Sequence, residues 1–527
     1  MKHMKLKCLT AAVLAIGASS AFAATPTVCN SASTADVYVN TCTPDIEMYV
    51  GGSSALAPAI TAVAPADLFD GTITIVHDGG SPNGTIGYNA VTAWYGKAKS
   101  TLGTAAGKNL FVVYNKQNGS AAGISQLLST IKDTTIPEQD VVTIGPMSKV
   151  AGVVAAVGDQ AASTGGSNNC SLGADTTSAG ITYHNVTCTT HARTQADVGI
   201  SDVRPDLLFA LEGVKPKSLT TLNYYELANQ GFGIGVNANL YNAMQTVQAA
   251  DGRIPSTCVA GDLTAACQPT ISHAEYASLI TVTGGIKSAA ALLGNSDTTL
   301  LTLSRRDDLS GTQASTNMYF ADNACGNNVT PGKTTLIKGV LGGELALLGS
   351  PAPSPIVNPV YTIAGVLNVN DQNASSSVIT DLTSTTGYAI GSVTLNSAEP
   401  ARTATSWKFI KLDGISPNFN ADGTLADHQR PAVANGLWGF QVTSFAAVQI
   451  KPFSKTSVVT TYPSVVAALI GTGPTKHDGG LSNSTLHNLE GIAYLDGAAD
   501  PSVLDGSYKQ AHYFHTNGNS CSPLIHK

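Results

Sequence analysis

Four short segments of the sequence each place hydroxyl groups, free backbone N–H groups or a charge where a strand gives way to a helix. Helix N-termini leave N–H groups unpaired and carry a partial positive charge, so such corners suit tetrahedral oxyanions. Ser and Thr add short donors, and Arg adds a planar charged fork. The chemistry that these residue types predict is the binding of an anion. The segments are residues 52–55 (GSSA), 119–123 (GSAAG), 199–202 (GISD) and 306–312 (RDDLSGT).

Each segment taken singly also has an ordinary structural explanation. Ser54, Ser120 and Ser201 could be helix N-caps. Arg306 with Asp308 could be a surface ion pair, and we expect the neighbouring Arg305 to be solvated.

The elements that must position these segments follow from apolar runs and turn residues. Short strands alternate with Gly/Ser/Thr turns and helices, which predicts an α/β architecture with ligands at the carboxyl ends of strands. We expect strands at residues 46–50, 110–114, 198–201, 231–237, 300–303, 387–393 and 441–450, and helices that begin near residues 55, 121 and 313.

Taken together and in order, the segments resemble a known family. The stretches VGGSSALAP (50–58), NGSAAGISQL (118–127), ADVGISD (196–202) and, most specifically, SRRDDLSGTQAST (304–316) are similar to motifs of the type 2 periplasmic binding proteins that deliver phosphate to the ABC phosphate-uptake transporter. GFGIGVN (231–237), GYAIGSV (387–393), KLDGISP (411–417) and NGLWGFQVTSF (435–445) resemble that family's structural elements. The resemblance implies a two-lobed α/β fold with a ligand cleft between the lobes.

The resemblance also assigns roles at the cleft. Asp202 would accept the proton of hydrogen phosphate, Arg306 would supply the positive charge, and Asp308 would orient it. A buried carboxylate can pair with protonated phosphate and must repel fully ionised sulfate, which gives a physical reason for selectivity. The ligand-binding set that the resemblance implies is Ser54, Ala55, Ser120, Asp202, Arg306, Asp308, Ser310, Gly311 and Thr312. Two residues depart from the family pattern: Ala55 stands where an aromatic is usual, and Leu309 replaces a usual Gly.

The chain divides into an export signal and two interleaved lobes. Lys2, Lys5 and Lys7 precede a short apolar run and an Ala-Phe-Ala site, which is typical of a signal peptide over residues 1–23. We expect an N-terminal disulfide-stapled segment at 24–42, lobe 1 at 43–232 with insertions near 60–108 and 129–195, lobe 2 at 233–448, and the return part of lobe 1 at 449–527.

Cysteine usage agrees with export. Of nine cysteines, Cys8 lies in the signal, and an even number in an oxidising compartment suggests four disulfides. The sequence leaves the connectivity open, although nearest-neighbour pairing would join the first six in order. No two cysteines show the Cys-x-x-Cys spacing that is typical of a metal site. The candidates are Cys29, Cys42, Cys170, Cys188, Cys258, Cys267, Cys325 and Cys521.

Composition excludes some functions and leaves one alternative open. Charged residues make up 12% of the 527 residues and the net charge is -7, so we expect no nucleic acid as a partner. We expect an exported protein, periplasmic or extracellular, with no cofactor, no metal and no enzymatic activity. Its expected partners are inorganic phosphate and an ABC phosphate transporter permease. The alternative is a secreted scaffold, adhesin or filament protein that reuses the fold and binds copies of itself or cell-surface components.

Overall fold

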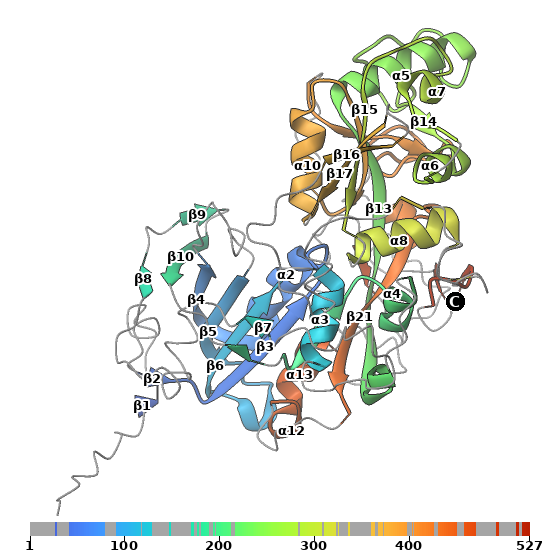
Figure 1. Cartoon of the computed structure of the whole chain (residues 1–527). Coiled ribbons are helices and arrows are strands. Elements are labelled where there is room, and N and C mark those ends of the chain that lie inside the picture. Colours follow the sequence, from blue (N-terminus) through green and yellow to red (C-terminus); the bar gives the residue numbers. More distant parts are fainter. Residues whose placement is uncertain are drawn as a thin grey trace, which may run out of the picture.

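The computed structural model is a mixed α/β protein (Figure 1). It describes residues 27–28, 42–78, 91–116, 119–128, 147–148, 170–172, 176–178, 181–188, 193–194, 196–211, 217–282, 285–307, 310–322, 325, 336–337, 360–363, 367–372, 374–397, 403, 405–425, 430–450, 458–470, 492–494, 513–515 and 519–526. The expected signal peptide, residues 1–23, lies outside these ranges, as do Cys29 and Asp308.

Sixteen strands of the described residues form one large mixed sheet. In sheet order the main path is β16 (Val360–Ile363), β17 (Leu367–Gln372), β15 (Leu301–Arg306), β18 (Tyr388–Thr394), β13 (Leu222–Val236), β21 (Gln441–Gln449), β12 (Val198–Ser201), β3 (Ile46–Gly52), β6 (Asn109–Asn115), β5 (Val91–Ala98), β4 (Phe69–Asp78), β10 (Ile181–Cys188) and β8 (Cys170–Leu172). Off this path, β19 (Lys408–Phe409) and β22 (Ile492–Tyr494) pair with β13, and β9 (Thr176–Ser178) pairs with β10.

Helices lie beside this sheet along its length. They are α2 (Ala57–Leu68), α3 (Gly119–Leu128), α4 (Pro205–Leu211), α5 (Ala238–Asp251), α6 (His273–Leu279), α7 (Ala289–Leu293), α8 (Gly311–Ala321), α10 (Ser375–Ser384), α11 (Arg430–Ala434), α12 (Val458–Thr461) and α13 (Pro463–Ile470). No helix in the ranges given above is both long and apolar enough to cross a bilayer.

The strand β13 connects the two ends of the sheet. It is antiparallel to β21 from Leu222 to Gly231 and antiparallel to β18 from Phe232 to Val236. Figure 1 shows β15, β16, β17, α5 and α10 beyond one end of β13, and β3, β6, α2 and α3 in the other part of the molecule, where β12 separates β3 and β6 from β21. The predicted strand at 231–237 is therefore the last part of a longer strand that serves both ends of the sheet.

Two runs of parallel strands bring their carboxyl ends to common edges. β12, β3 and β6 are parallel neighbours in one run, and β18, β15 and β17 in the other. The predicted strands at 46–50, 110–114, 198–201, 300–303, 387–393 and 441–450 are all confirmed to within a few residues. Because parallel strands end at one edge, the turns that follow them are brought close together.

Apolar runs without alternation are explained by burial on both faces of the sheet. In β6, Phe111 and Val113 join one hydrophobic core, while Leu110 and Val112 join the other. A strand covered on both faces carries apolar residues at every position, because successive side chains point to opposite faces.

Glycine at two positions lets α3 lie directly on the parallel strands. A Cβ atom at Gly123 would come within 2.5 Å of the Gly52 Cα, and one at Gly199 within 2.5 Å of the Gly123 carbonyl oxygen. No side chain fits at such distances. The close approach places the start of α3 beside the turns that follow β3 and β12.

Two disulfides tie described segments together. Cys258 bonds to Cys267, and Cys325 bonds to Cys521, as nearest-neighbour pairing predicts. The strands β8 and β10 place Cys170 opposite Cys188 in register. Disulfides are typical of oxidising compartments.

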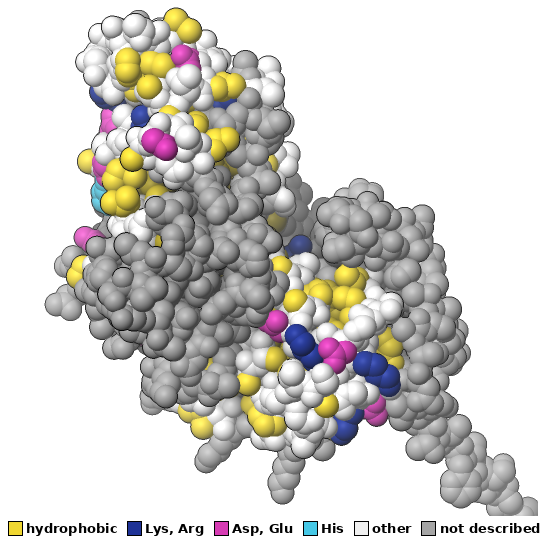
Figure 2. All heavy atoms as spheres, turned by 180° about the vertical axis from the view of Figure 1, so that it is seen from behind, with side chains coloured by type: hydrophobic (Ala, Val, Ile, Leu, Met, Phe, Trp, Pro, Cys, Tyr) yellow, Lys and Arg dark blue, Asp and Glu magenta, His cyan; other side chains and the backbone are white. Residues whose placement is uncertain are grey.

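Charged side chains are sparse on the surface. In the view of Figure 2, the described surface is mostly uncharged, and the few Lys, Arg, Asp and Glu side chains lie scattered or next to opposite charges. This matches the charged content of 12%.

Candidate functional site

Three corners of the parallel run β12–β3–β6 meet at one acidic residue. The Ser53 hydroxyl, in the turn after β3, donates to Asp202 Oδ1, just after β12. The Asp202 N–H donates to Ser120 Oγ at 3.0 Å, in the first turn of α3. Asp202 is 2% exposed, and Ser53 and Ser120 are fully buried. Segments far apart in sequence therefore surround one carboxylate.

The Ser53 turn is itself held by backbone and side-chain bonds. Its N–H donates to the Ile200 carbonyl at 3.0 Å, and its hydroxyl oxygen accepts from the Leu56 N–H at 3.0 Å. The Tyr114 hydroxyl, near the end of β6, donates to the Ser53 carbonyl. The turn is thus anchored on both neighbouring strands.

A fourth corner brings the guanidinium of Arg306, the last residue of β15. Its Nη1 donates to Ser375 Oγ at 2.9 Å and to Ser54 Oγ at 3.4 Å. Its Nε donates to the Gln372 carbonyl at 3.1 Å, and its Nη2 lies 3.4 Å from Asp307 Oδ2. Arg306 is 1% exposed. The charge is buried and held in place from several sides.

The start of α8 lies directly against Ser120 and Asp202. A Cβ atom at Gly311 would come within 2.4 Å of Ser120 Oγ and 2.5 Å of Asp202 Oδ2, so only glycine allows this approach. Ser310 is the N-cap residue, and its side chain makes no capping bond. The hydroxyl oxygen of Thr312 is buried without a hydrogen-bond partner among the described residues.

Burial of the Thr312 hydroxyl without a partner among the described residues is energetically unfavourable. Leaving a buried polar group without a partner costs about 1–3 kcal/mol. The first N–H groups of a helix also lack partners within the helix and carry a partial positive charge. The Thr312 hydroxyl and the first turn of α8 are therefore donors suited to an acceptor that enters the site.

Burial sets the protonation behaviour of the site. It raises the pKa of Asp202 to about 6, against the lowering effects of the Ser53 hydrogen bond, the Arg306 charge and the Ser120 hydrogen bond. The pKa of Tyr114 is raised well above its ordinary value, first by burial and then by the Asp202 charge. The phenol therefore stays neutral, and the Asp202 carboxyl group loses its proton as pH rises through about 6.

The arrangement combines one cation, one acceptor and several hydroxyl and N–H donors around a buried point. It can hold an anion that also carries a proton. In the described part of the chain, no group of three His, Cys, Asp or Glu side chains is placed to hold a metal ion.

The structure brings together most of the residues named from the sequence. Ser54, Ser120, Asp202, Arg306 and Gly311 lie at the converging corners with the contacts given above. Ser310 stands at the N-cap position of α8 without a side-chain capping bond, and Thr312 lies in the first turn of that helix. Ala55 is buried, and its carbonyl accepts hydrogen bonds. Asp308 lies outside the described residues.

The capping interpretations of the serines are wrong. Ser120 lies inside the first turn of α3, and α2 begins after Leu56. The Ser201 hydroxyl donates to the Val203 carbonyl at 2.6 Å. Ser54 does not cap α2, because the N-cap residue of that helix is Leu56 and no side chain makes a capping bond there.

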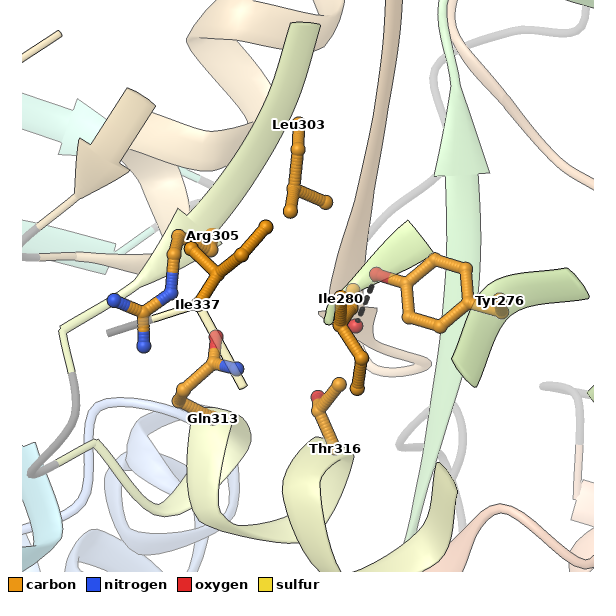
Figure 3. A pocket seen from close by; sticks show the side chains of 8 residues that line it. Tyr276, Ile280, Leu303, Arg305, Gln313, Thr316 and Ile337 are labelled. Carbon is orange, nitrogen blue, oxygen red and sulfur yellow. Dashed lines mark hydrogen bonds between the residues drawn. The ribbon is translucent and has the colours of Figure 1, made fainter. Parts of the chain in front are cut away.

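The expectation that Arg305 is solvated is also wrong. Arg305 is 4% exposed, and its Nη1 lies 3.3 Å from Asp371 Oδ1 in a buried ion pair. Its side chain lines a small cavity of about 10 Å³ together with Tyr276, Gln313 and Thr316 (Figure 3). A volume of this size holds about one water molecule.

Sequence reasoning missed several contacts of the site. Ser53, and not only Ser54, contributes a hydroxyl, and Ser375 at the start of α10 holds Arg306. The carboxylate beside Arg306 in the described residues is Asp307. A signal existed for Ser375, because it follows the strand β17 in an Asn/Ser-rich turn before a helix. Tyr114 gave no such signal within its apolar run.

Comparisons with known proteins give distant structural likenesses. No family model and no curated protein matches the chain. It is similar to a solved structure described as an ABC-type phosphate transport receptor from Vibrio cholerae, at 14% identity and a TM-score of 0.26, over 51% of this chain and 73% of that chain. It is also similar to one described as a possible phosphate binding protein from Planctomyces limnophilus DSM 3776, at 12% identity and a TM-score of 0.26, over 52% and 69%. At this TM-score the likenesses carry no argument about the ligand.

Proposed function

We propose that this protein is an exported solute-binding protein that binds inorganic phosphate, or a similar tetrahedral oxyanion, in a cleft between two lobes. The observation that supports this most is that Arg306 and Asp202 are both buried and close enough for the Arg306 charge to act on the Asp202 carboxyl, next to the first turn of α8. The Thr312 hydroxyl of that turn is buried without a partner among the described residues. A buried cation and unpaired donors match an oxyanion, and a buried acceptor matches a proton on it.

Phosphate is favoured over sulfate by the carboxylate of Asp202. Hydrogen phosphate carries a proton near neutral pH and can donate it to the carboxylate, whereas sulfate presents only acceptors. A sulfate oxygen that faced the Asp202 carboxylate would leave two buried acceptors together. Such an arrangement costs about 1–3 kcal/mol, and more when both groups are charged. No covalent step is part of this proposal, and the protein is not an enzyme under it.

The two lobes of the proposal follow the division made from the sequence. Lobe 1 comprises residues 43–232 and 449–527, and lobe 2 comprises residues 233–448. The strands β13 and β21 are the crossing segments, and a hinge motion about them would close the lobes over the anion. Ligand would stabilise the closed state by its differential affinity for it.

Calorimetric titration of the mature chain with phosphate and with sulfate tests the proposal. We expect heat with phosphate and none with sulfate at equal concentration. Arg306→Ala should weaken phosphate binding by about 100-fold or more, because it removes charge-assisted hydrogen bonds. The matched control is Arg253→Ala, because Arg253 is exposed and pairs with Asp251 and Glu275.

The same titration decides against the proposal if it gives no heat with phosphate. Absence of heat together with self-assembly in solution would favour the secreted scaffold, adhesin or filament protein named above. If Arg306→Ala binds phosphate with the affinity of the wild type, the phosphate site does not include Arg306. A permease of an ABC phosphate transporter is the partner that this proposal implies.

A further inference from the structure

The carbonyl group of Ala55 is held by two side-chain amides from distant parts of the chain. Asn396 Nδ2 donates to it at 2.6 Å, and Gln230 Nε2 donates to it at 3.1 Å. Ala55 directly follows the two serines of the turn after β3. Its carbonyl therefore ties the turn that carries Ser53 and Ser54 to elements outside the β12–β3–β6 run.

The amide of Gln230 is itself fully engaged. Its Nε2 also donates to Thr394 Oγ1 at 2.9 Å, and its Oε1 accepts from Ser444 Oγ at 3.2 Å. Gln230 lies on β13, Thr394 on β18 and Ser444 on β21, so one buried amide joins three strands to the turn. A side chain bonded at all these positions has a fixed orientation.

The tied turn is the one that faces both charges of the site. The Ser53 hydroxyl donates to Asp202, and the Ser54 hydroxyl accepts from Arg306. A displacement of the Ala55 carbonyl would move both serines relative to the carboxylate and the guanidinium.

We propose that Asn396 and Gln230 are positioning residues for the anion site, and that they hold the Ser53–Ser54 turn against Asp202 and Arg306 through the Ala55 carbonyl. This rests on the proposed function for its ligand, inorganic phosphate. Neither side chain touches the anion under this proposal. Asn396 joins the end of β18 to the turn, so the bond also favours the arrangement in which the two ends of the sheet are closed on the anion.

The test compares Asn396→Ala and Asn396→Asp with the wild type by calorimetric titration with phosphate across pH. Loss of one hydrogen bond in Asn396→Ala should weaken phosphate binding by about tenfold at every pH. In Asn396→Asp at neutral pH, a carboxylate would face the Ala55 carbonyl, and binding should weaken further. At low pH the protonated carboxyl can donate to that carbonyl, so the affinity relative to wild type at the same pH should recover.

The ratio to wild type removes the contribution of Asp202, which titrates in the same range. The matched control is Asn239→Asp, an exposed asparagine whose amide donates to the Thr386 carbonyl at 2.9 Å, away from the site. It should bind phosphate as the wild type does at every pH.

A second measurement follows the turn without ligand. Hydrogen exchange of a peptide covering residues 53–60 should be faster in Asn396→Ala than in wild type, while a peptide covering 109–115 in β6 should be unchanged. Equal exchange and equal phosphate affinity in wild type and both Asn396 variants would overturn the positioning role alone. No phosphate binding by the wild type would overturn the proposed function, and with it the positioning role.

Discussion

Arg305 and Arg306 are consecutive residues of one strand and belong to two different regions of the molecule. Arg305 faces a buried ion pair with Asp371 and a cavity of about 10 Å³, whereas Arg306 faces the corners that surround Asp202. Successive side chains of a strand point to opposite faces, so neighbours in sequence enter unlike surroundings. The same residue type is therefore structural at one position and a candidate ligand contact at the next.

The largest effect should come from removing the structural arginine. Arg305→Ala leaves the Asp371 carboxylate buried without its guanidinium, and breaking such a pair costs about 3–5 kcal/mol of the free energy of unfolding. Urea denaturation measures this, and Arg253→Ala at an exposed pair should cost at most about 1 kcal/mol. The folded fraction of Arg305→Ala should still bind phosphate. Loss of phosphate binding without loss of stability would erase the contrast between the two arginines.

The next effect concerns pH and the buried carboxyl group of Asp202. Burial raises the pKa of Asp202 from 3.8 to about 6 in the folded protein. Between these values the folded state binds more protons than the unfolded state, so the free energy of unfolding falls as pH rises through about 6. The change is about 3 kcal/mol, present in full below pH 4 and lost above pH 6.

Urea denaturation in phosphate-free buffers between pH 4 and pH 7 measures this dependence. Asp202→Asn should flatten it over that range. The control Asp251→Asn should leave it in place, because Asp251 is exposed and its pKa is lowered chiefly by its hydrogen bond from Arg253. The same slope in Asp202→Asn and wild type would show that the pKa of Asp202 is not raised in the folded protein.

At Thr312 we expect two smaller effects of opposite sign, a gain in stability and a loss of phosphate affinity. Thr312→Val removes a buried hydroxyl without a partner among the described residues, so it should raise the free energy of unfolding by about 1 kcal/mol. It should also weaken phosphate binding by about tenfold, because the hydroxyl is a donor to the anion. Urea denaturation and calorimetric titration measure the two quantities.

The matched control is Thr316→Val, one turn further along α8, where the hydroxyl donates to the Thr312 carbonyl at 2.8 Å. It should lose a little stability and keep its phosphate affinity. If Thr312→Val were destabilising and bound phosphate normally, the hydroxyl would have a structural partner in solution.

The smallest effect on phosphate affinity is expected at Ser375, whose hydroxyl accepts a hydrogen bond from Arg306. Ser375→Ala removes one hydrogen bond of 2.9 Å to the guanidinium and leaves its other contacts. Phosphate affinity should fall by less than about tenfold, because one neutral acceptor of several is lost. The exposed neighbour Ser376 provides the control, and Ser376→Ala should bind as wild type does in the same titration.

Local pattern predicted much of the fold and part of the site. The apolar runs at 46–50 and 110–114 became strands because their residues are buried on both faces, and the turn residues after them begin helices. The extension of β13 back to Leu222 was not predictable, because its first half carries polar residues that only the pairing with β21 explains. The hydroxyl of Ser53 was missed because nothing local separates a site serine from a turn serine, and Ser375 was missed although it follows a strand at the start of a helix.

By itself, the sequence determined the order of strands and helices, the kinds of donor at four corners, and one motif with two adjacent arginines. These properties depend on neighbours along the chain, where apolar spacing and turn residues act. Only the tertiary structure decided that Arg306 meets Asp202 while Arg305 pairs with Asp371, and that the Ala55 carbonyl is held by Gln230 and Asn396. The reason is that strand order and register bring together residues that no spacing in the sequence relates.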